Sequence, residues 1–268
     1  MQHPLVLCGH GWLGNYLAET REPATVISTT RTPEKCQQLA QQGYQAIPFT
    51  LGDDPAVLTR HCSQATVLLN IPPGRRNPSL DTYLDNMLAL IDALIDVKVG
   101  HIIFISTTSV YGEETTHIVT ENTPVDPQTV SAKTHIAIEK RLRRYPNYRY
   151  SIVRLAGLVG PDRHPVNVLS GKHFSAGNKV VNLVHVADVV TALTQLIRRG
   201  GEGKTYHLCS LAHPKRGDYY PRTAHARGLA LPRFDDTTAL PVGKRIDARW
   251  SWEMLDTRPR FATPDDMM

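Results

Sequence analysis

The chain has 268 residues, of which 41% are hydrophobic and 21% are charged, and its formal net charge is +5. This length suits an α/β domain with a small additional lobe, and the basic excess is too small by itself to indicate a nucleic-acid partner. No apolar stretch approaches the ~20 residues of a membrane helix, and no signal peptide is recognisable. We therefore expect a cytoplasmic globular protein that binds neither membrane nor nucleic acid.

The cysteines and histidines do not form a recognisable metal-binding pattern. The four cysteines include no Cys-x-x-Cys pair, so a zinc site or a redox pair gains no support, and we expect reduced thiols. His164 and His173 also lack the spacing of metal ligands. We predict no metal site.

The first element contains the pattern on which the functional prediction depends. Leu5–Cys8 is a short apolar run, typical of a buried parallel strand. It is followed by Gly-x-Gly-x-x-Gly at Gly9, Gly11 and Gly14 and by a helix expected at 13–19. In such a turn the first glycine allows the tight exit, the second lets backbone approach a pyrophosphate, and the third lets the helix pack closely. The helix start also favours phosphate groups. Alone the pattern is weak, because most glycine triplets are only turns.

Strands and helices then alternate along the chain. Further strands are expected at 24–29, 46–49, 65–70, 101–106, 150–155 and 205–209. Helices are expected from Pro33 to just before Gly43, after the turn at 52–55, and at about 79–97, 130–144 and 186–197. This alternation predicts an α/β fold with a Rossmann-type doubly wound parallel sheet. The glycine turn would lie at the carboxyl edge of that sheet, where ligands bind.

The proline-containing stretches interrupt this alternation and predict a second, smaller lobe. We expect a dinucleotide-binding Rossmann domain at 1–156 and a substrate lobe formed by 157–180 and 210–268. Residues 181–209 would return to the Rossmann domain.

Arg31 indicates which dinucleotide is bound. NAD-selective sites place an acidic residue about 20 positions after the glycines, and here the second strand ends Ser28-Thr29-Thr30-Arg31. A cation beside hydroxyl groups suits a 2′-phosphate, so NADP is favoured and NAD remains an alternative. Arg31 could also simply cap a surface loop.

Four later motifs give the chain a resemblance to a known family. Residues 106–112 read S-x-x-x-V-Y-G, residues 154–161 read R-x-x-x-x-x-G-P, and residues 182–190 read N-x-x-H-V-x-D-x-V, with Tyr206-His207-Leu208 after them. With the glycine turn, this order resembles the extended short-chain dehydrogenase/reductases, the NAD(P)-dependent epimerase/dehydratase family, over residues 4–209. Within that family the chain resembles the small YeeZ-like bacterial proteins.

The resemblance implies a set of cofactor-binding residues and a reaction type. The implied cofactor site comprises Gly9, Gly11, Trp12, Leu13, Gly14, Arg31, Asp53, Ile71, Pro72 and Pro73. Asp53 would contact the adenine amino group, and the residues at 71–73 would line the cofactor trough. The implied function is an NADP(H)-dependent oxidoreductase or epimerase-like enzyme acting on a small polar substrate, with a homodimer formed through the two long helices after the fourth and fifth strands.

The catalytic machinery of the family does not carry over completely. Family members use a Tyr-x-x-x-Lys pair, and here the matching positions hold Ser131 and His135, while Lys133 is two residues off, about 160° around the helix. Thr107 maps to the hydroxyl that orients the reacting oxygen. Ser131 and His135 at i+4 could form a proton relay, or both could be ordinary helix residues. Tyr111 is the nearest phenol, with no base identifiable beside it.

The missing pair leaves a second functional class open, a non-catalytic NADP(H) sensor that signals to a partner. A nucleic-acid-binding protein is a weaker third hypothesis. Its support is three basic pairs, Arg75-Arg76, Arg143-Arg144 and Arg198-Arg199. Cations at helix ends are expected from the helix dipole, whereas Arg75-Arg76 follows the fourth strand and could attract an anionic ligand. We interpret His185 and Asp188 as structural, with Asp188 completing a helix N-cap.

Overall fold

The main sheet has seven strands, and its order confirms the predicted doubly wound α/β fold. The computed structural model describes residues 4–73, 80–112 and 117–268. The strand order is β11-β7-β5-β4-β1-β2-β3, and the pairs from β5 to β3 run parallel. The strands are β1 (Leu5–Cys8), β2 (Val26–Thr30), β3 (Gln45–Pro48), β4 (Thr66–Leu69), β5 (His101–Thr107), β7 (Tyr150–Leu155) and β11 (Lys204–Leu208). The chain moves outward from β1 to β3 and then restarts at β4 on the other side of β1, so the topological switch point lies between β1 and β4, where folds of this type bind ligands.

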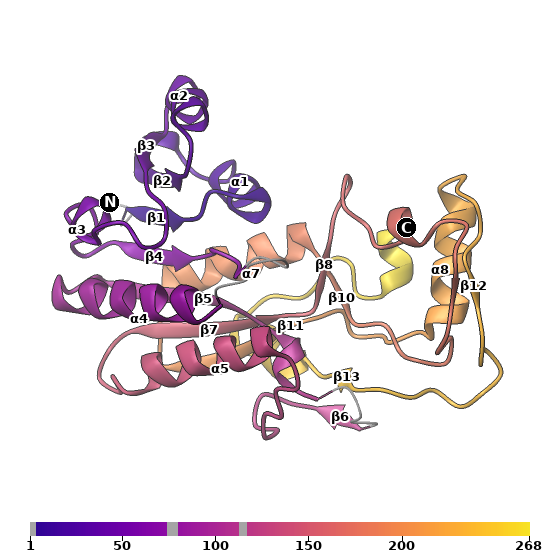
Figure 1. The fold of residues 1–268 in the computed structure, drawn as a ribbon. Helices are drawn as coiled ribbons and strands as arrows, with labels where there is room; N and C mark the ends of the chain where they lie inside the picture. The colour runs from indigo at the N-terminus through magenta and orange to yellow at the C-terminus, as the bar shows by residue number, and fades with distance from the viewer. Residues whose placement is uncertain (1–3, 74–79, 113–116) are drawn as a thin grey trace. The chain divides into compact units, whose positions relative to one another are not determined.

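The helices between these strands begin and end close to the predicted positions. They are α1 (Trp12–Ala18), α2 (Pro33–Gln41), α3 (Ala56–Thr59), α4 (Leu80–Asp96), α5 (Val130–Arg143) and α7 (Val186–Arg199), with short 3₁₀ turns at Pro23–Thr25 and Thr108–Val110. At α2 the Thr32 hydroxyl accepts a hydrogen bond from the Lys35 amide at 3.4 Å, and Gly43 has φ +88°. Thr32 is thus the N-cap of α2, and Gly43 is its C′ glycine. Figure 1 shows α4 and α5 side by side along the sheet.

Burial of the central strands explains why they contain almost no polar residues. Every residue of β1 and β4 is buried, as expected for strands covered on both faces. A core cluster joins these strands to the inward faces of α4 and α5 through side chains such as Val67, Met87 and Leu142.

The chain forms two compact units whose segments alternate along the sequence. Unit 1 contains 1–110, 127–153 and 193–205, and unit 2 contains 111–126, 154–192 and 206–268. The boundaries predicted from the sequence differ from these units at 111–126, 154–156, 181–192 and 206–209, and the domain assignment stays a prediction.

Unit 2 is built from short elements around its own core. Its helices are α6 (Val166–Leu169), α8 (Arg216–Ala226) and α9 (Arg249–Met254), with a final 3₁₀ turn at Pro264–Met267. Its paired strands are β6 (Ile118–Val119) with β13 (Arg245–Ile246), β8 (Gly157–Val159) with β10 (Leu183–His185), and β9 (His173–Phe174) with β12 (Arg233–Phe234).

Helix α8 lies in one of the proline-containing stretches, and Pro221 lies inside this helix. A proline has no N–H, so the helix lacks the backbone hydrogen bond from position 221 to the carbonyl of Gly217, at a cost of about 3 kcal/mol. Burial of Tyr219, Tyr220 and Ala224 in the core of unit 2 offsets that cost.

Candidate functional site

Gly9 lies where no side chain fits. Its φ is +95°, and a Cβ built on it would come within 2.7 Å of the Asn70 carbonyl oxygen and 3.1 Å of Ile71 Cγ1. Its amide donates to Thr29 Oγ1 at 2.9 Å. The turn after β1 is therefore held against the ends of β2 and β4, at the switch point of the sheet.

Gly11 and Gly14 have opposite surroundings. Gly11 is the N-cap residue of α1, with φ −94°, and a Cβ built on it would meet no heavy atom of the described residues within 4 Å. A Cβ on Gly14 would instead lie 3.3 Å from the Gly9 carbonyl oxygen. Gly9 and Gly14 are thus required by the fold itself, whereas the space above Gly11 is open to a ligand. This cradle, which a Cβ would fill, fits the approach of a pyrophosphate to the backbone.

The start of α1 offers backbone groups rather than side chains to such a ligand. Leu13 is 4% exposed and belongs to the core, so its contribution to the predicted cofactor site would come from its amide. The Trp12 ring packs edge-on against Tyr16, with centroids 5.0 Å apart. The first N–H groups of a helix have no acceptor within the helix, and Gly11 brings no capping side chain.

The end of β2 carries hydroxyl groups that are already used within the protein. The Ser28 hydroxyl lies 2.7 Å from His10 Nδ1, and the Thr29 carbonyl accepts from the His10 amide at 2.9 Å. Burial lowers the pKa of His10, so its ring is neutral near pH 7. Arg31 follows β2 directly and is exposed. The role of Thr29 as the acceptor for Gly9 has no local sequence signal, because it depends on strand pairing between β1 and β2.

The other predicted cofactor residues also lie on loops that leave the carboxyl edge. Asp53 is exposed and closes its own turn, since its Oδ2 accepts from the Thr50 amide at 2.6 Å. The Ile71 carbonyl accepts from Tyr83 at 2.7 Å, which fixes the path of the chain after β4. Pro72 and Pro73 follow without regular structure. Arg75-Arg76 lies outside the described residues.

Thr107 stands at the end of β5, as predicted. Its hydroxyl donates to Ser109 Oγ at 3.0 Å and accepts from the Ser109 amide at 3.1 Å. This local turn fixes the hydroxyl at the carboxyl edge of the sheet.

His135 is turned toward its own helix backbone. Its Nδ1 donates to the Ser131 carbonyl oxygen at 2.9 Å rather than to the Ser131 hydroxyl. The ring is 9% exposed and lies 5.8 Å from the Phe104 ring, and burial lowers its pKa. His135 is thus neutral with its proton on Nδ1, and any relay to Ser131 would use Nε2. The relay stays a prediction.

The rest of α5 explains why Lys133 does not replace the missing lysine of the family. Lys133 is exposed, on the side of α5 away from His135. Glu139, the residue used to align the helix, is completely buried and accepts from the Ser106 hydroxyl at 2.7 Å and from Arg143 at 3.1 Å. It therefore ties α5 to β5.

Tyr111 has a base beside it, which corrects the expectation that none is identifiable. Its hydroxyl lies 2.7 Å from His207 Nε2 and also accepts from Arg154. His207 Nδ1 donates to the Asp247 carbonyl at 3.0 Å, so Nε2 is the acceptor. The pair is separated by 96 positions, and no local signal reveals it. Tyr111 is 1% exposed, so this group is a buried polar network within unit 2.

His185 and Asp188 are structural, although Asp188 acts differently from the prediction. His185 Nδ1 accepts from the Ala187 amide at 3.2 Å at the start of α7. The Asp188 carboxylate instead accepts from the amides of Arg260 and Phe261, at 2.8 and 3.0 Å. It therefore anchors the C-terminal segment rather than capping α7.

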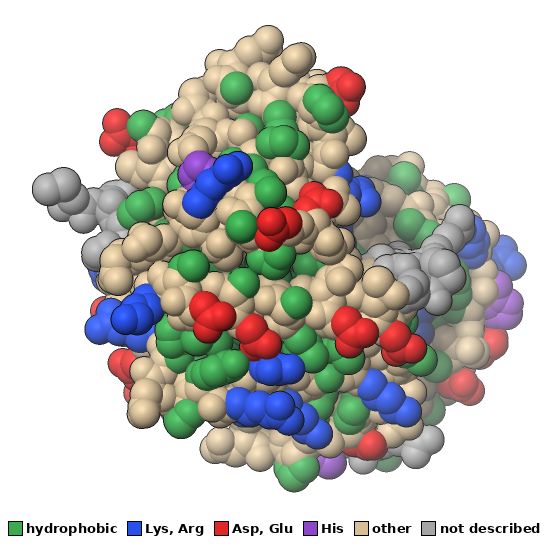
Figure 2. Space-filling view, turned by 60° about the vertical axis from the view of Figure 1, so that its left-hand side comes forward, with side chains coloured by type: hydrophobic (Ala, Val, Ile, Leu, Met, Phe, Trp, Pro, Cys, Tyr) green, Lys and Arg blue, Asp and Glu red, His purple; other side chains and the backbone are tan. Residues whose placement is uncertain are grey.

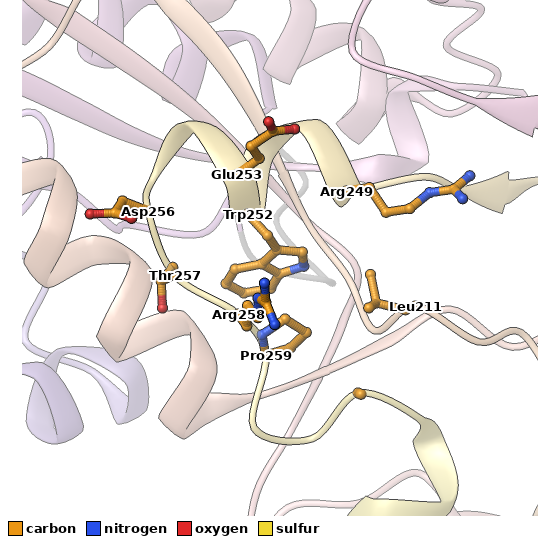
Figure 3. A pocket seen from close by; sticks show the side chains of 9 residues that line it. Leu211, Arg249, Trp252, Glu253, Asp256, Thr257, Arg258 and Pro259 are labelled. Carbon is orange, nitrogen blue, oxygen red and sulfur yellow. The ribbon is translucent and has the colours of Figure 1, made fainter.

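A pocket within unit 2 contains none of the predicted site residues. It has a volume of about 680 Å³ and is lined by residues of α9 and the following loop (Figure 3). Acidic and basic side chains both line the pocket, and Arg249 forms an ion pair with Asp247 at 2.7 Å. Trp252 is one of the lining side chains, and its Nε1 donates to the Cys209 carbonyl at 3.0 Å.

The face of the molecule in Figure 2 gives little support to a nucleic-acid interface. The face in Figure 2 mixes acidic and basic side chains instead of presenting a continuous basic surface. Arg141 of α5, for example, pairs with Asp92 of α4 at 3.1 Å. Over 4–73, 80–112 and 117–268, no helix is long and apolar enough to cross a membrane, and no His, Cys, Asp or Glu cluster could hold a metal ion.

Comparison with known proteins identifies the family. The model of the NAD dependent epimerase/dehydratase family matches residues 5–209. Protein YeeZ of Escherichia coli is 33% identical over 251 residues, covering 91% of this chain and 90% of that protein. Two solved structures share the fold at 18% identity and cover 99% of this chain and 96% of their own: UDP-glucuronic acid 4-epimerase from Bacillus cereus in complex with NAD (TM-score 0.80) and UDP-glucose 4-epimerase from Thermotoga maritima with UDP-glucose (TM-score 0.81). The chain belongs to the NAD dependent epimerase/dehydratase family.

Proposed function

We propose that this protein binds NADP(H) and acts as an oxidoreductase or epimerase-like enzyme on a small polar substrate. The observation that carries the proposal is the contrast within the glycine turn. Gly9 and Gly14 lie against backbone, whereas the space above Gly11 is open. A turn whose middle glycine has no packing reason to be glycine is expected where a ligand must approach the backbone.

The residues that would hold the dinucleotide all belong to unit 1. The amides at the start of α1, beginning at Trp12, would receive the pyrophosphate. Asp53 would contact the adenine amino group, and residues 71–73 would line the cofactor trough. When bound, the nicotinamide supplies hydride chemistry. The most direct test is mass spectrometry of the small molecules that co-purify with the protein, which would identify the cofactor and any retained substrate.

The preference for NADP rests on Arg31. It follows β2 directly, is exposed, and has no carboxylate at the three positions before it that could bind a ribose 2′-hydroxyl instead. Arg31→Ala should lower NADP(H) affinity at least tenfold and change NAD(H) affinity less than twofold, because a charge-assisted hydrogen bond to phosphate contributes ~1.5–3 kcal/mol. Calorimetric titrations with both dinucleotides measure this. Equal losses for the two would contradict the role of Arg31.

Thr107 would orient the reacting oxygen of the substrate, and the proton would pass through water or through Ser131 and His135. The structure supports the first role by fixing the Thr107 hydroxyl through Ser109. Thr107→Val, which keeps the shape and removes the hydroxyl, should lower turnover on an active substrate from a nucleotide-sugar and carbonyl panel by at least tenfold. Thr238→Val, the same change at an exposed position, serves as the control. If Thr107→Val has no effect, the assigned role is wrong.

A non-catalytic NADP(H) sensor is the second candidate. It is favoured by the α5 geometry, in which Lys133 is exposed and the Nδ1 of His135 is engaged by backbone. The sensor predicts different affinities for the oxidised and reduced cofactor and no turnover on any substrate. Turnover with a single substrate would exclude it.

The homodimer through α4 and α5 remains a proposal that analytical ultracentrifugation can test.

A further inference from the structure

Unit 1 has another cavity, at the opposite end of the strands from the glycine turn. It has a volume of about 500 Å³ and is lined by the first residues of β4 and β5, by the turn before β7 and by the end of α7. The strands separate it from the carboxyl edge by their own length, ~13 Å for four-residue β4 and ~23 Å for seven-residue β5 at 3.3 Å per residue. It is therefore distinct from the proposed dinucleotide site.

The Lys, Arg, Asp and Glu side chains among the described lining residues of this cavity are all basic. Lys98, Arg149, Arg198 and Arg199 line it, and none of its described lining residues is Asp or Glu. Glu202, the acid that follows α7, is not among those residues and pairs with Lys204. Four cations around one cavity create a strongly positive potential inside it.

The helix dipole accounts for only part of this arrangement. Arg198 and Arg199 occupy the last turn of α7, where cations are expected. Arg149 lies outside any helix, immediately before β7. Lys98 follows the end of α4 in a left-handed conformation, φ +55°. These two side chains reach the same cavity from separate segments.

His101, the first residue of β5, is a buried histidine in the wall of the cavity. It lines the cavity, is 2% exposed, and its Nδ1 is buried without a hydrogen-bond partner among the described residues. Its Nε2 lies 3.0 Å from the Ser151 hydroxyl. Burial lowers the pKa of His101 to about 4, so the ring is neutral and one nitrogen carries the proton.

We propose that this cavity binds a phosphorylated small molecule, with Lys98, Arg149 and the α7 arginines holding the phosphate groups. The volume falls within the range of small-molecule sites. Arginine matches phosphate oxygens in a fork-like geometry.

The test compares pyrophosphate binding by calorimetry at constant ionic strength in matched variants. Lys98→Gln/Arg149→Gln removes two lining cations and should weaken binding at least tenfold. The control Lys140→Gln/Lys172→Gln removes the same charge at two exposed positions outside the cavity and should change binding less than twofold. Gly11→Ala blocks the proposed dinucleotide site, and the pyrophosphate binding that depends on Lys98 and Arg149 should persist in this variant.

A spectroscopic readout reports on His101 directly. Its ¹⁵N chemical shifts should move on addition of pyrophosphate in the wild type and in the control variant. The proposal is wrong if binding is lost in Gly11→Ala and kept in the cavity variant, or if cavity and control variants lose the same affinity. It is also wrong if a single-stranded RNA binds the cavity more tightly than pyrophosphate does. In that case the RNA would displace bound pyrophosphate at a concentration below the dissociation constant of pyrophosphate.

Discussion

Replacement of Gly11 by alanine separates ligand binding from stability at the glycine turn. At this position φ is −94° and no described heavy atom lies within 4 Å of the added Cβ. The helix loses the N-cap preference of glycine over alanine, about 0.5–1 kcal/mol, and the unfolded chain loses a similar amount of conformational freedom. The two effects oppose each other, so the free energy of unfolding should change by less than about 1 kcal/mol.

Dinucleotide binding should respond much more strongly to the same change. The methyl group would occupy the space through which the pyrophosphate approaches the backbone. A loss of at least tenfold in NADP(H) affinity, about 1.4 kcal/mol, is expected by calorimetry. Urea unfolding followed by tryptophan fluorescence measures the stability of the same samples.

Gly9 provides the contrasting variant. Its φ of +95° and the 2.7 Å approach to the Asn70 carbonyl mean that Gly9→Ala strains the backbone and displaces the loop after β4. We expect about 2–4 kcal/mol of destabilisation, since a left-handed conformation alone costs ~1–2 kcal/mol. If Gly11→Ala binds NADP(H) like the wild type, or destabilises the fold as much as Gly9→Ala, the reasoning from open space is refuted.

Two further predictions concern stability in unit 2. Asp188→Asn should lower the free energy of unfolding by about 1–3 kcal/mol, because the carboxylate accepts from both the Arg260 and Phe261 amides and a carboxamide offers only one oxygen; urea unfolding measures the loss, and a change below 0.5 kcal/mol, about the effect of a neutral surface substitution, would contradict this anchoring role. His164 is buried, accepts from the Val166 amide through Nδ1, and has its pKa lowered from 6.5 to about 4 by burial first. The neutral ring contributes fully to stability above pH 6.5. As the pH falls toward 4, the unfolded chain binds the proton before the folded protein does, so the free energy of unfolding decreases. At pH 5 this decrease amounts to about 1–2 kcal/mol. His164→Asn should flatten the thermal stability profile between pH 7 and 5, and an unchanged slope would exclude this residue as a cause.

Much of unit 1 was predictable because its signals are local. The apolar runs, the Thr32 cap and the glycine at position 43 each act within a few residues, and the structure has β1, α2 and the other elements at or near the expected positions. Unit 2 was less predictable, because its strands have two or three residues and its helix α8 contains Pro221. Such elements are stabilised by burial against distant segments rather than by their own periodicity.

The sequence by itself determined the family, the order of strands and helices, and the position of the glycine turn at the carboxyl edge, since motif order and periodicity encode all three. The sequence could not show which of the three glycines is required by packing and which leaves space for a ligand. Only the tertiary structure shows that Gly9 is confined by the loop after β4 while the space above Gly11 is open. The partners of Tyr111 and the cations around His101 likewise come from segments far apart in the chain. These arrangements depend on how the chain folds back on itself, which a linear pattern does not record.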